Sequence, residues 1–129
     1  MWQNIILVGL GSMIGGISRF LLSGWIKHYI TTSFPWGTFV VNMIGCFLIG
    51  ILSGIFATQD SQSQRLFFIV GFCGSFTTFS TFSMENLQLL TSRSYALFSL
   101  NTGISVITGI LFAGLGYMLT TKLKIWILQ

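Results

Sequence analysis

Long apolar stretches alternate with short polar ones along the whole chain. Apart from Arg19, charged residues leave four long gaps, over residues 1–18, 29–59, 66–84 and 94–121. Each gap approaches or exceeds the roughly 20 residues that a helix needs to cross the hydrocarbon core of a bilayer. The pattern predicts helices at about 3–27, 36–58, 65–91 and 95–121, in one domain that spans residues 1–129.

The segments between the predicted helices are short. The first, KHYITTSFPWG, contains the only proline, Pro35, and proline is favoured at a helix start. TQDSQSQR forms the second connection, and TSRS is a tight turn before the fourth helix. The C-terminal KLKIWILQ, basic and then apolar, is predicted to follow the fourth helix as a tail.

Composition supports an all-α integral membrane protein. The chain is 53% hydrophobic and only 6% charged, whereas soluble domains are about 25% charged. The first stretch, NIILVGLGSMIGGISRFLLSGWI, has no basic segment before it and is long enough for a full span. We therefore expect a membrane helix there and not a signal peptide.

The charges outside the apolar stretches give almost no orientation signal. With four spans, Arg65, Lys122 and Lys124 lie on one side of the membrane, and Lys27 and Arg93 lie on the other. Either the protein is weakly oriented, or copies insert both ways and pair antiparallel as a dual-topology homodimer. Four helices leave little interior for a transport path, so a homo-oligomer is expected. Two small-xxx-small patterns, GSMIG and GILSG, favour close helix packing.

The third predicted helix contains an unusual stretch, GFCGSFTTFSTFSMENL. Its hydroxyl residues are too dense to be explained by hydrogen bonds back to their own helix. Gly71, Gly74 and the hydroxyl residues weaken the helix, and a break is expected near 74–78, although the glycines also suit simple helix packing. Freed carbonyls can hold a small cation such as Na⁺, and freed amides favour an anion.

Aromatic and hydroxyl side chains alternate after the expected break. Phe79 and Phe82 are three residues apart and share a helix face, as do Thr78 and Thr81. Ring edges carry partial positive charge, and hydroxyls donate hydrogen bonds. Together they indicate a path for a small anion. The phenylalanine spacing is also compatible with a face that packs against lipid or other helices.

Polar side chains occur in the other predicted helices as well. Asn42 lies deep in the second helix, with Thr38 one turn before it, and it serves either an anion or a hydrogen bond between helices. Arg19 either extends to the membrane interface or gives a vestibule positive potential. In the fourth helix a polar stripe follows helical spacing, at Asn101, Ser105 and Thr108.

Three motifs taken together, GGISR, GTFVVN and GFCGSFTTFSTFS, resemble the Fluc-type (CrcB family) fluoride channels. The resemblance covers essentially the whole chain in length, number of spans and motif order. It implies an antiparallel dual-topology dimer with two pores, through which fluoride leaves the cell by passive electrodiffusion. It also implies location in the bacterial inner membrane and no nucleic-acid partner.

The resemblance assigns roles to individual residues. A structural Na⁺ at the dimer centre is implied at the backbone carbonyls of Gly74 and Thr77 from both subunits. Arg19 matches the arginine of the family's first helix and is assigned to the vestibule. The residues implied to line the fluoride pore are Asn42, Phe79, Phe82, Ser80, Thr81, Thr38, Ser105 and Asn101.

Other functions make different demands on the sequence. A small proton-coupled multidrug-type exporter needs a carboxylate within the membrane, and Glu85, at the end of the hydroxyl run, is the only glutamate. An acid paired with a base explains Glu85 equally well. A purely structural subunit would not need interleaved aromatic and hydroxyl residues. No enzyme is expected, because His28 has no carboxylate or metal ligand near it in the sequence.

Overall fold

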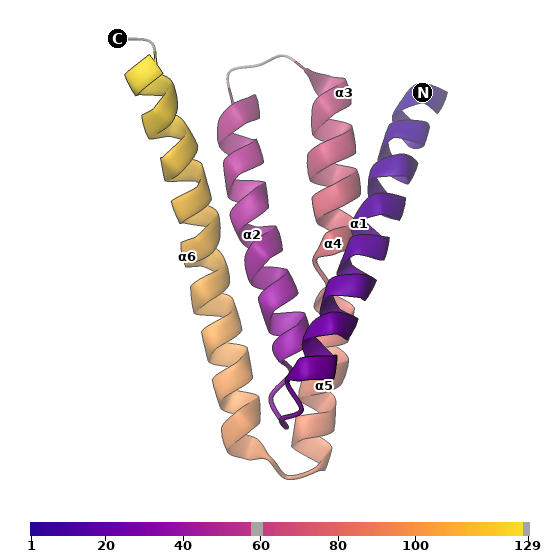
Figure 1. Cartoon of the computed structure of the whole chain (residues 1–129), viewed down its shortest axis with the longest axis vertical. Helices are drawn as coiled ribbons and strands as arrows, with labels where there is room; N and C mark the ends of the chain where they lie inside the picture. Colours follow the sequence, from indigo (N-terminus) through magenta and orange to yellow (C-terminus); the bar gives the residue numbers. More distant parts are fainter. Residues whose placement is uncertain (58–60, 128–129) are drawn as a thin grey trace.

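The computed structural model describes residues 1–57 and 61–127, and all its regular elements are helical (Figure 1). Four segments are long and apolar enough to cross a membrane, which confirms the predicted all-helical chain with four spans. They cover Trp2–Tyr29, Trp36–Phe56, Gln62–Thr91 and Tyr95–Lys124. The helical elements are α1 (Trp2–Tyr29), α2 (Trp36–Phe56), α3 (Gln62–Arg65), the π-helix η1 (Leu66–Cys73), α4 (Gly74–Phe76), α5 (Phe79–Thr91) and α6 (Tyr95–Ile127).

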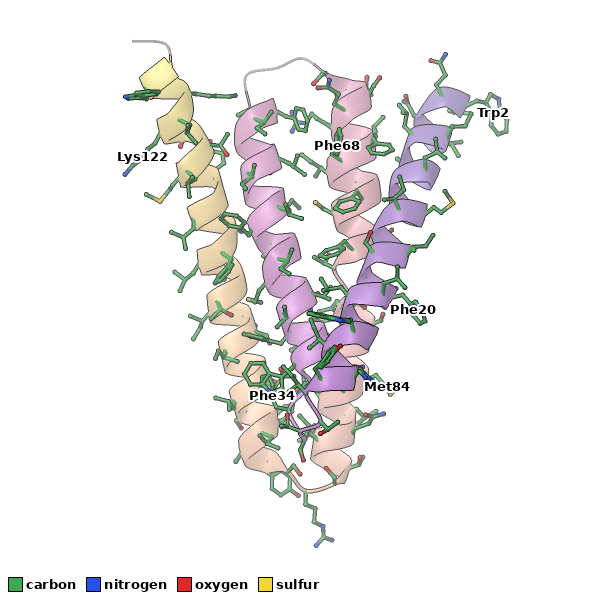
Figure 2. All side chains as sticks on the ribbon, in the orientation of Figure 1. Trp2, Phe20, Phe34, Phe68, Met84 and Lys122 are labelled. Atoms are coloured by element: carbon green, nitrogen blue, oxygen red, sulfur yellow. The ribbon has the colours of Figure 1, made fainter. Side chains whose placement is uncertain are left out.

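The spans run up and down, so that both ends of the described chain lie at the same end of the bundle (Figure 1). The start of α1, the end of α2, the start of α3 and the end of α6 lie there, and the α1–α2 and α5–α6 connections lie at the opposite end. Trp2, Phe20 and Lys122 point away from the bundle (Figure 2). Most large apolar side chains on α1 and α6 are exposed, as lipid contact requires.

Glycines bring the backbones of α2 and α6 into direct contact. A Cβ atom on Gly50 would collide with the carbonyl of Ala113, and one on Gly116 would collide with the carbonyl of Phe47. Because neither residue has a side chain, the two helices approach until backbone touches backbone. This confirms that the GILSG pattern serves close packing.

The GSMIG pattern serves the same purpose between α1 and η1. A Cβ atom on Gly11 would collide with the carbonyl of Phe67, and one on Gly15 would collide with that of Phe72. Gly71 meets α1 from the other side, since its Cβ atom would lie 2.8 Å from the Val8 carbonyl oxygen. Gly71 is thus a packing residue of the first half of the third span.

The prediction that the fourth helix ends near residue 121 is wrong, because α6 continues to Ile127. The Nζ atom of Lys124 donates to the carbonyl oxygens of Gly54 at 2.9 Å and Ile55 at 2.7 Å. These carbonyls belong to the last turn of α2, where helical donors are missing. The lysine therefore extends the α2–α6 contact and does not begin a separate tail. The predicted end of the second helix, residue 58, lies outside the described residues.

The third span is not a uniform α-helix. η1 and α4 are followed by two residues in extended conformation, Thr77 at φ −81° and ψ 156° and Thr78 at φ −145° and ψ 114°, before α5 begins. Room for this link exists because Gly45 of α2 has no side chain, and a Cβ atom there would collide with the Thr77 methyl group. The link lies about midway along the span, beside α2.

Candidate functional site

The side chain of Asn42 on α2 is bonded to the backbone of Thr78. The Thr78 amide donates to Asn42 Oδ1 at 2.8 Å, and Asn42 Nδ2 donates to the Thr78 carbonyl oxygen at 3.3 Å. The asparagine amide thus pairs with both polar groups of one residue, as a neighbouring peptide group would. The Asn42 NH₂ group has a second hydrogen that these bonds do not use.

Thr78 also caps the helix that follows it. Its Oγ1 atom accepts from the backbone amide of Thr81 at 3.2 Å and donates to Thr81 Oγ1 at 2.9 Å. Threonine is a favoured residue at this position because its hydroxyl satisfies an amide that the first turn of a helix leaves without a partner. Ser80 Oγ lies 3.4 Å from the same Thr78 hydroxyl. The hydroxyl residues at 78, 80 and 81 therefore form one cluster.

These bonds divert two amides from their normal helical acceptors. In a continuous α-helix the Thr78 amide would bond to the carbonyl of Gly74, and the Thr81 amide would bond to that of Thr77. Both amides bond instead to side-chain oxygens, of Asn42 and Thr78. Gly74 lies exposed on the surface of the subunit. The carbonyls of Gly74 and Thr77 are consequently released from their i+4 donors.

An open pocket of about 300 Å³ lies beside the link, between α2, α5 and α6. The rings of Phe79 and Phe82 form part of its wall, with centroids 5.8 Å apart and planes tilted by 35°. Phe79 is 78% exposed, so one side of this wall faces out of the subunit. The pocket is lined by Asn42, Met43, Cys46, Ile49, Thr77, Thr78, Phe79, Phe82, Ser105 and Val106.

The predicted pore residues divide into those at this pocket and those elsewhere. Four of them line it: Asn42, Phe79, Phe82 and Ser105. Ser80 and Thr81 belong to the hydroxyl cluster at the start of α5, where Ser80 is exposed. Thr38 and Asn101 are 2% and 1% exposed and lie away from the pocket lining.

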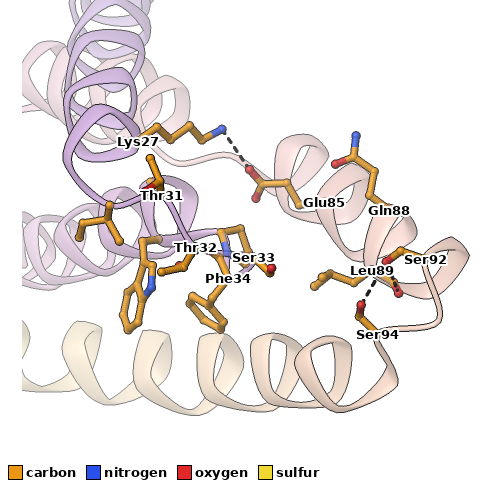
Figure 3. Close-up of a pocket in the computed structure, with 14 residues that line it drawn as sticks. Lys27, Thr31, Thr32, Ser33, Phe34, Glu85, Gln88, Leu89, Ser92 and Ser94 are labelled. Carbon is orange, nitrogen blue, oxygen red and sulfur yellow. Dashed lines mark hydrogen bonds and ion pairs between the residues drawn. The ribbon is translucent and has the colours of Figure 1, made fainter.

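A second cavity, of about 600 Å³, opens at the end of the bundle near the α1–α2 connection (Figure 3). On its wall, Lys27 Nζ lies 3.3 Å from Glu85 Oε1. Thr38 Oγ1 donates to the same oxygen at 2.8 Å, while Glu85 Oε2 is buried and has no hydrogen-bond partner among the described residues. The geometry matches the interpretation of Glu85 as an acid paired with a base.

Arg19 lies beside the link and is partly buried. Its Nε atom donates to the carbonyl oxygen of Ser75 at 3.1 Å. Ser75 lies in the short α4, whose C-terminal carbonyls lack helical donors. The guanidinium therefore places a positive charge next to the link, a contact that the sequence did not predict.

Comparisons with known proteins decide the family. Residues 6–117 match the family described as "CrcB-like protein, Camphor Resistance (CrcB)". The chain belongs to this family.

Relatives of this CrcB family member match it over most of its length. The "Fluoride-specific ion channel FluC" of Azobacteroides pseudotrichonymphae genomovar. CFP2 is 44% identical over 122 residues, which cover 93% of this chain and 98% of the relative. The protein of the same name from Flavobacterium psychrophilum is 38% identical over 123 residues, or 94% and 99%. That from Leptospira interrogans serovar Lai is 44% identical over 117 residues, or 88% and 91%. All are named as channels, which agrees with the prediction that the chain is not an enzyme.

Family membership and the four spans together identify a multi-pass membrane protein. Within it, the structure shows three polar contacts whose partners the sequence pattern does not predict. Thr78 binds Asn42 and caps α5, Glu85 binds Thr38, and Asn86 binds Asn101. The only sequence signal for Thr78 was its position three residues before Thr81, and the partners of Glu85 and Asn86 depend on how helices rotate against one another.

Proposed function

We propose that this CrcB family protein is a fluoride-selective channel that exports fluoride by passive electrodiffusion. Its relatives carry that name, and one observation carries the proposal for this chain. Asn42 of α2, Phe79 and Phe82 of α5 and Ser105 of α6 converge on one pocket. They combine amide and hydroxyl groups with aromatic edges, beside the link residues Thr77 and Thr78 and several apolar side chains.

A dehydrated fluoride ion needs substitutes for its lost water. The free hydrogen on Asn42 Nδ2 supplies one donor, and the positive edges of the Phe79 and Phe82 rings supply weaker electrostatic contacts. Ser80 and Thr81 continue the path as hydroxyls at the start of α5. Thr38 and Asn101 are buried and do not line the pocket. In this proposal they lie at the edge of the ion path.

The working unit in this proposal is an antiparallel, dual-topology homodimer. Three observations support it: the nearly equal charge of the two bundle ends, the open side of the pocket, and the 78% exposure of Phe79 at its rim. A second, inverted copy would close each pocket into a pore, giving two pores for a dimer. The subunit alone leaves the path open along one side. The host membrane is the bacterial inner membrane.

A structural Na⁺ at the dimer centre is part of the proposal. The backbone carbonyls of Gly74 and Thr77 fit such a hard cation, since both have lost their i+4 amide donors and Gly74 is exposed where a second subunit would meet it. Among the described residues no group of three His, Cys, Asp or Glu side chains offers another metal site. A bound Na⁺ supplies fixed positive potential, and Arg19 adds to it from the vestibule side of the link.

The multidrug-type alternative requires a membrane carboxylate that exchanges protons with substrate. Glu85 is the only glutamate, and one of its oxygens is engaged by Lys27 and Thr38. An acid held by a base and a hydroxyl is poorly suited to proton exchange. The contacts of Glu85 therefore favour the channel.

The proposal is tested by replacing an aromatic wall. Phe82→Ile keeps the apolar volume but removes the ring edge, and we expect fluoride efflux from protein-loaded liposomes to fall at least about tenfold, the loss of roughly 1.4 kcal/mol of ion stabilisation. A fluoride electrode measures the efflux, with chloride flux and a proton gradient as parallel conditions.

Phe20→Ile is the matched control, because Phe20 points away from the bundle (Figure 2) and is 73% exposed. It should leave the efflux unchanged. If the Phe82 variant conducted as well as wild type while still forming the dimer, the aromatic wall would have no part in permeation.

A further inference from the structure

A buried chain of polar side chains connects the α5–α6 interface to the pocket. Asn101 Nδ2 donates to Asn86 Oδ1 at 3.1 Å, and Ser105 Oγ donates to Asn101 Oδ1 at 3.3 Å. Asn86 and Asn101 are 6% and 1% exposed, whereas Ser105 lines the pocket. The chain thus begins in the protein interior and ends at the proposed ion path.

The hydrogen bonds in this chain all point away from the pocket. Ser105 donates its only hydroxyl hydrogen to Asn101, and Asn101 donates one hydrogen of its NH₂ group to Asn86. A hydroxyl whose hydrogen is engaged elsewhere presents lone pairs to the pocket, and lone pairs repel an anion. In this arrangement Ser105 cannot stabilise fluoride.

The same chain can run in the opposite direction. The carbonyl and NH₂ ends of an asparagine have nearly the same shape, so turning the amide end for end exchanges donor and acceptor without moving the backbone. With both amides turned, Asn86 donates to Asn101, Asn101 donates to Ser105, and the serine hydrogen is free to face the pocket. Every bond of the chain is kept.

We propose that Asn86 and Asn101 form a reversible hydrogen-bond relay that turns Ser105 from an acceptor into a donor when fluoride enters the pocket. This inference rests on the proposed function, and it makes Asn101 a positioning residue that acts through Ser105 and does not contact the ion. An amide suits both positions because it donates from its NH₂ end and accepts at its oxygen, whereas a carboxylate accepts without donating and an aliphatic side chain does neither.

Thr102 biases the relay toward the direction in the structure. Its Oγ1 atom donates to Asn86 Oδ1 at 3.5 Å, which gives that oxygen a second donor. When Asn86 turns, the threonine hydroxyl can bond to a carbonyl of its own helix, as threonines in membrane helices commonly do. The relay therefore has a preferred resting direction. In the opposite direction, too, no buried donor is left without an acceptor.

The first experiment holds the hydrogen bonds of the relay in one direction by a substitution at Asn86, the end that lies away from the pocket. In Asn86→Asp a carboxylate accepts only, so Asn101 keeps its NH₂ group toward α5 and Ser105 keeps donating inward. We expect fluoride efflux from liposomes to fall about tenfold, as loss of one charge-assisted hydrogen bond predicts. In a Ser105→Ala background, which lacks the hydroxyl that the relay controls, the same substitution should cause no further fall.

Thr108→Val is the control, because Thr108 lies one turn beyond Ser105 in the polar stripe and bonds to Ile104 and Met43, outside the relay. Equal falls for Asn86→Asp in both backgrounds would overturn the relay, since added charge or altered packing acts whether or not Ser105 is present. Unchanged efflux in Ser105→Ala would also overturn it. In either case fluoride efflux by the wild-type protein would leave the channel function standing, whereas a wild-type protein without efflux would refute that function itself.

A second measurement needs no substitution at Asn86. The chain has four asparagines, so ¹⁵N-asparagine labelling gives four side-chain NH₂ signals in detergent-solubilised protein. Sodium fluoride should shift the signals of Asn86 and Asn101 in wild type, at constant sodium concentration, while sodium chloride should not. In Ser105→Ala these shifts should disappear. Signals of both residues that stay fixed under fluoride would refute the relay.

Discussion

The two faces of α2 solve the problem of packing in a membrane in opposite ways. Toward α6, Gly50 brings backbone against backbone, with no side chain between the helices at this point. Toward the third span, Asn42 reaches across to the backbone of Thr78, and an open pocket of about 300 Å³ remains beside it. The face toward α6 packs closely because Gly50 has no side chain. The face toward the third span makes hydrogen bonds through the side chain of Asn42.

The two faces of α2 therefore have different tasks: one holds the helices together, and the other supplies polar groups to the candidate site. Close packing of small residues brings α2 and α6 together at Gly50 and Gly116, and Lys124 extends this contact to the end of α2. The polar face holds an irregular backbone, which membranes tolerate only where protein or a water-filled cavity satisfies it. Substitutions on the first face should therefore affect folding, and substitutions on the second should affect conduction.

The largest effect is expected on the close-packed face. Gly50→Leu would drive a side chain into the carbonyl of Ala113, and the helices would have to separate at a cost of about 3 kcal/mol or more, a large fraction of the stability of a typical domain. Monodisperse protein in detergent chromatography should be lost.

Gly114→Leu is the matched control on α6, because nothing lies within 4 Å of a Cβ atom there. It should yield wild-type amounts of folded protein. A Gly50→Leu variant that elutes and melts like wild type would show that the backbone contact between α2 and α6 is not needed.

The next effect concerns the polar face and should leave the fold intact. Asn42→Asp still accepts from the Thr78 amide but loses the donor to the Thr78 carbonyl. Its negative charge at about 4 Å would raise the energy of fluoride by roughly 4 kcal/mol at an effective dielectric constant of 20. Fluoride efflux should fall at least about a hundredfold, as measured with an electrode in liposomes. Normal efflux would reduce Asn42 to a link between helices.

The smallest effect is expected at the end of the close-packed face. Lys124→Met removes two hydrogen bonds to the last carbonyls of α2, at a cost of about 1 kcal/mol where water can replace them. The melting temperature should fall by a few degrees, with fluoride efflux unchanged. Lys122→Met, at an exposed position that points away from the bundle (Figure 2), should shift melting less. Equal shifts in melting temperature for the two variants would show that the hydrogen bonds of Lys124 to α2 do not stabilise the protein.

The sequence predicted the spans well because charge is costly in hydrocarbon and the gaps between charges are long. It misplaced the end of α6 for the same reason. By charge alone, Lys122 and Lys124 mark the membrane boundary, whereas Lys124 donates to the carbonyls of the last turn of α2. A rule based on charge cannot recognise a lysine whose partner lies 70 residues away in the chain.

The sequence predicted several residues of the candidate site but not the hydrogen bonds between them. Residue types identified Asn42, Phe79, Phe82 and Ser105, and the structure places them at one pocket. The bonds from Thr38 to Glu85 and from Asn101 to Asn86 depend on how α2, α5 and α6 are rotated about their axes. For α2 and α6, that rotation brings Gly50 and Gly116 to the shared interface, which no local pattern at the site encodes.

The pairing of Asn42 with Thr78 has a consequence for how the bundle assembles. Taken out of the protein, the third span has no asparagine side chain from α2 to satisfy the Thr78 amide, and the acceptor that a regular helix provides for that amide is the Gly74 carbonyl. That bond belongs to an unbroken helix. The extended link is thus imposed by a neighbouring helix, and a synthetic peptide of residues 62–91 in lipid should straighten.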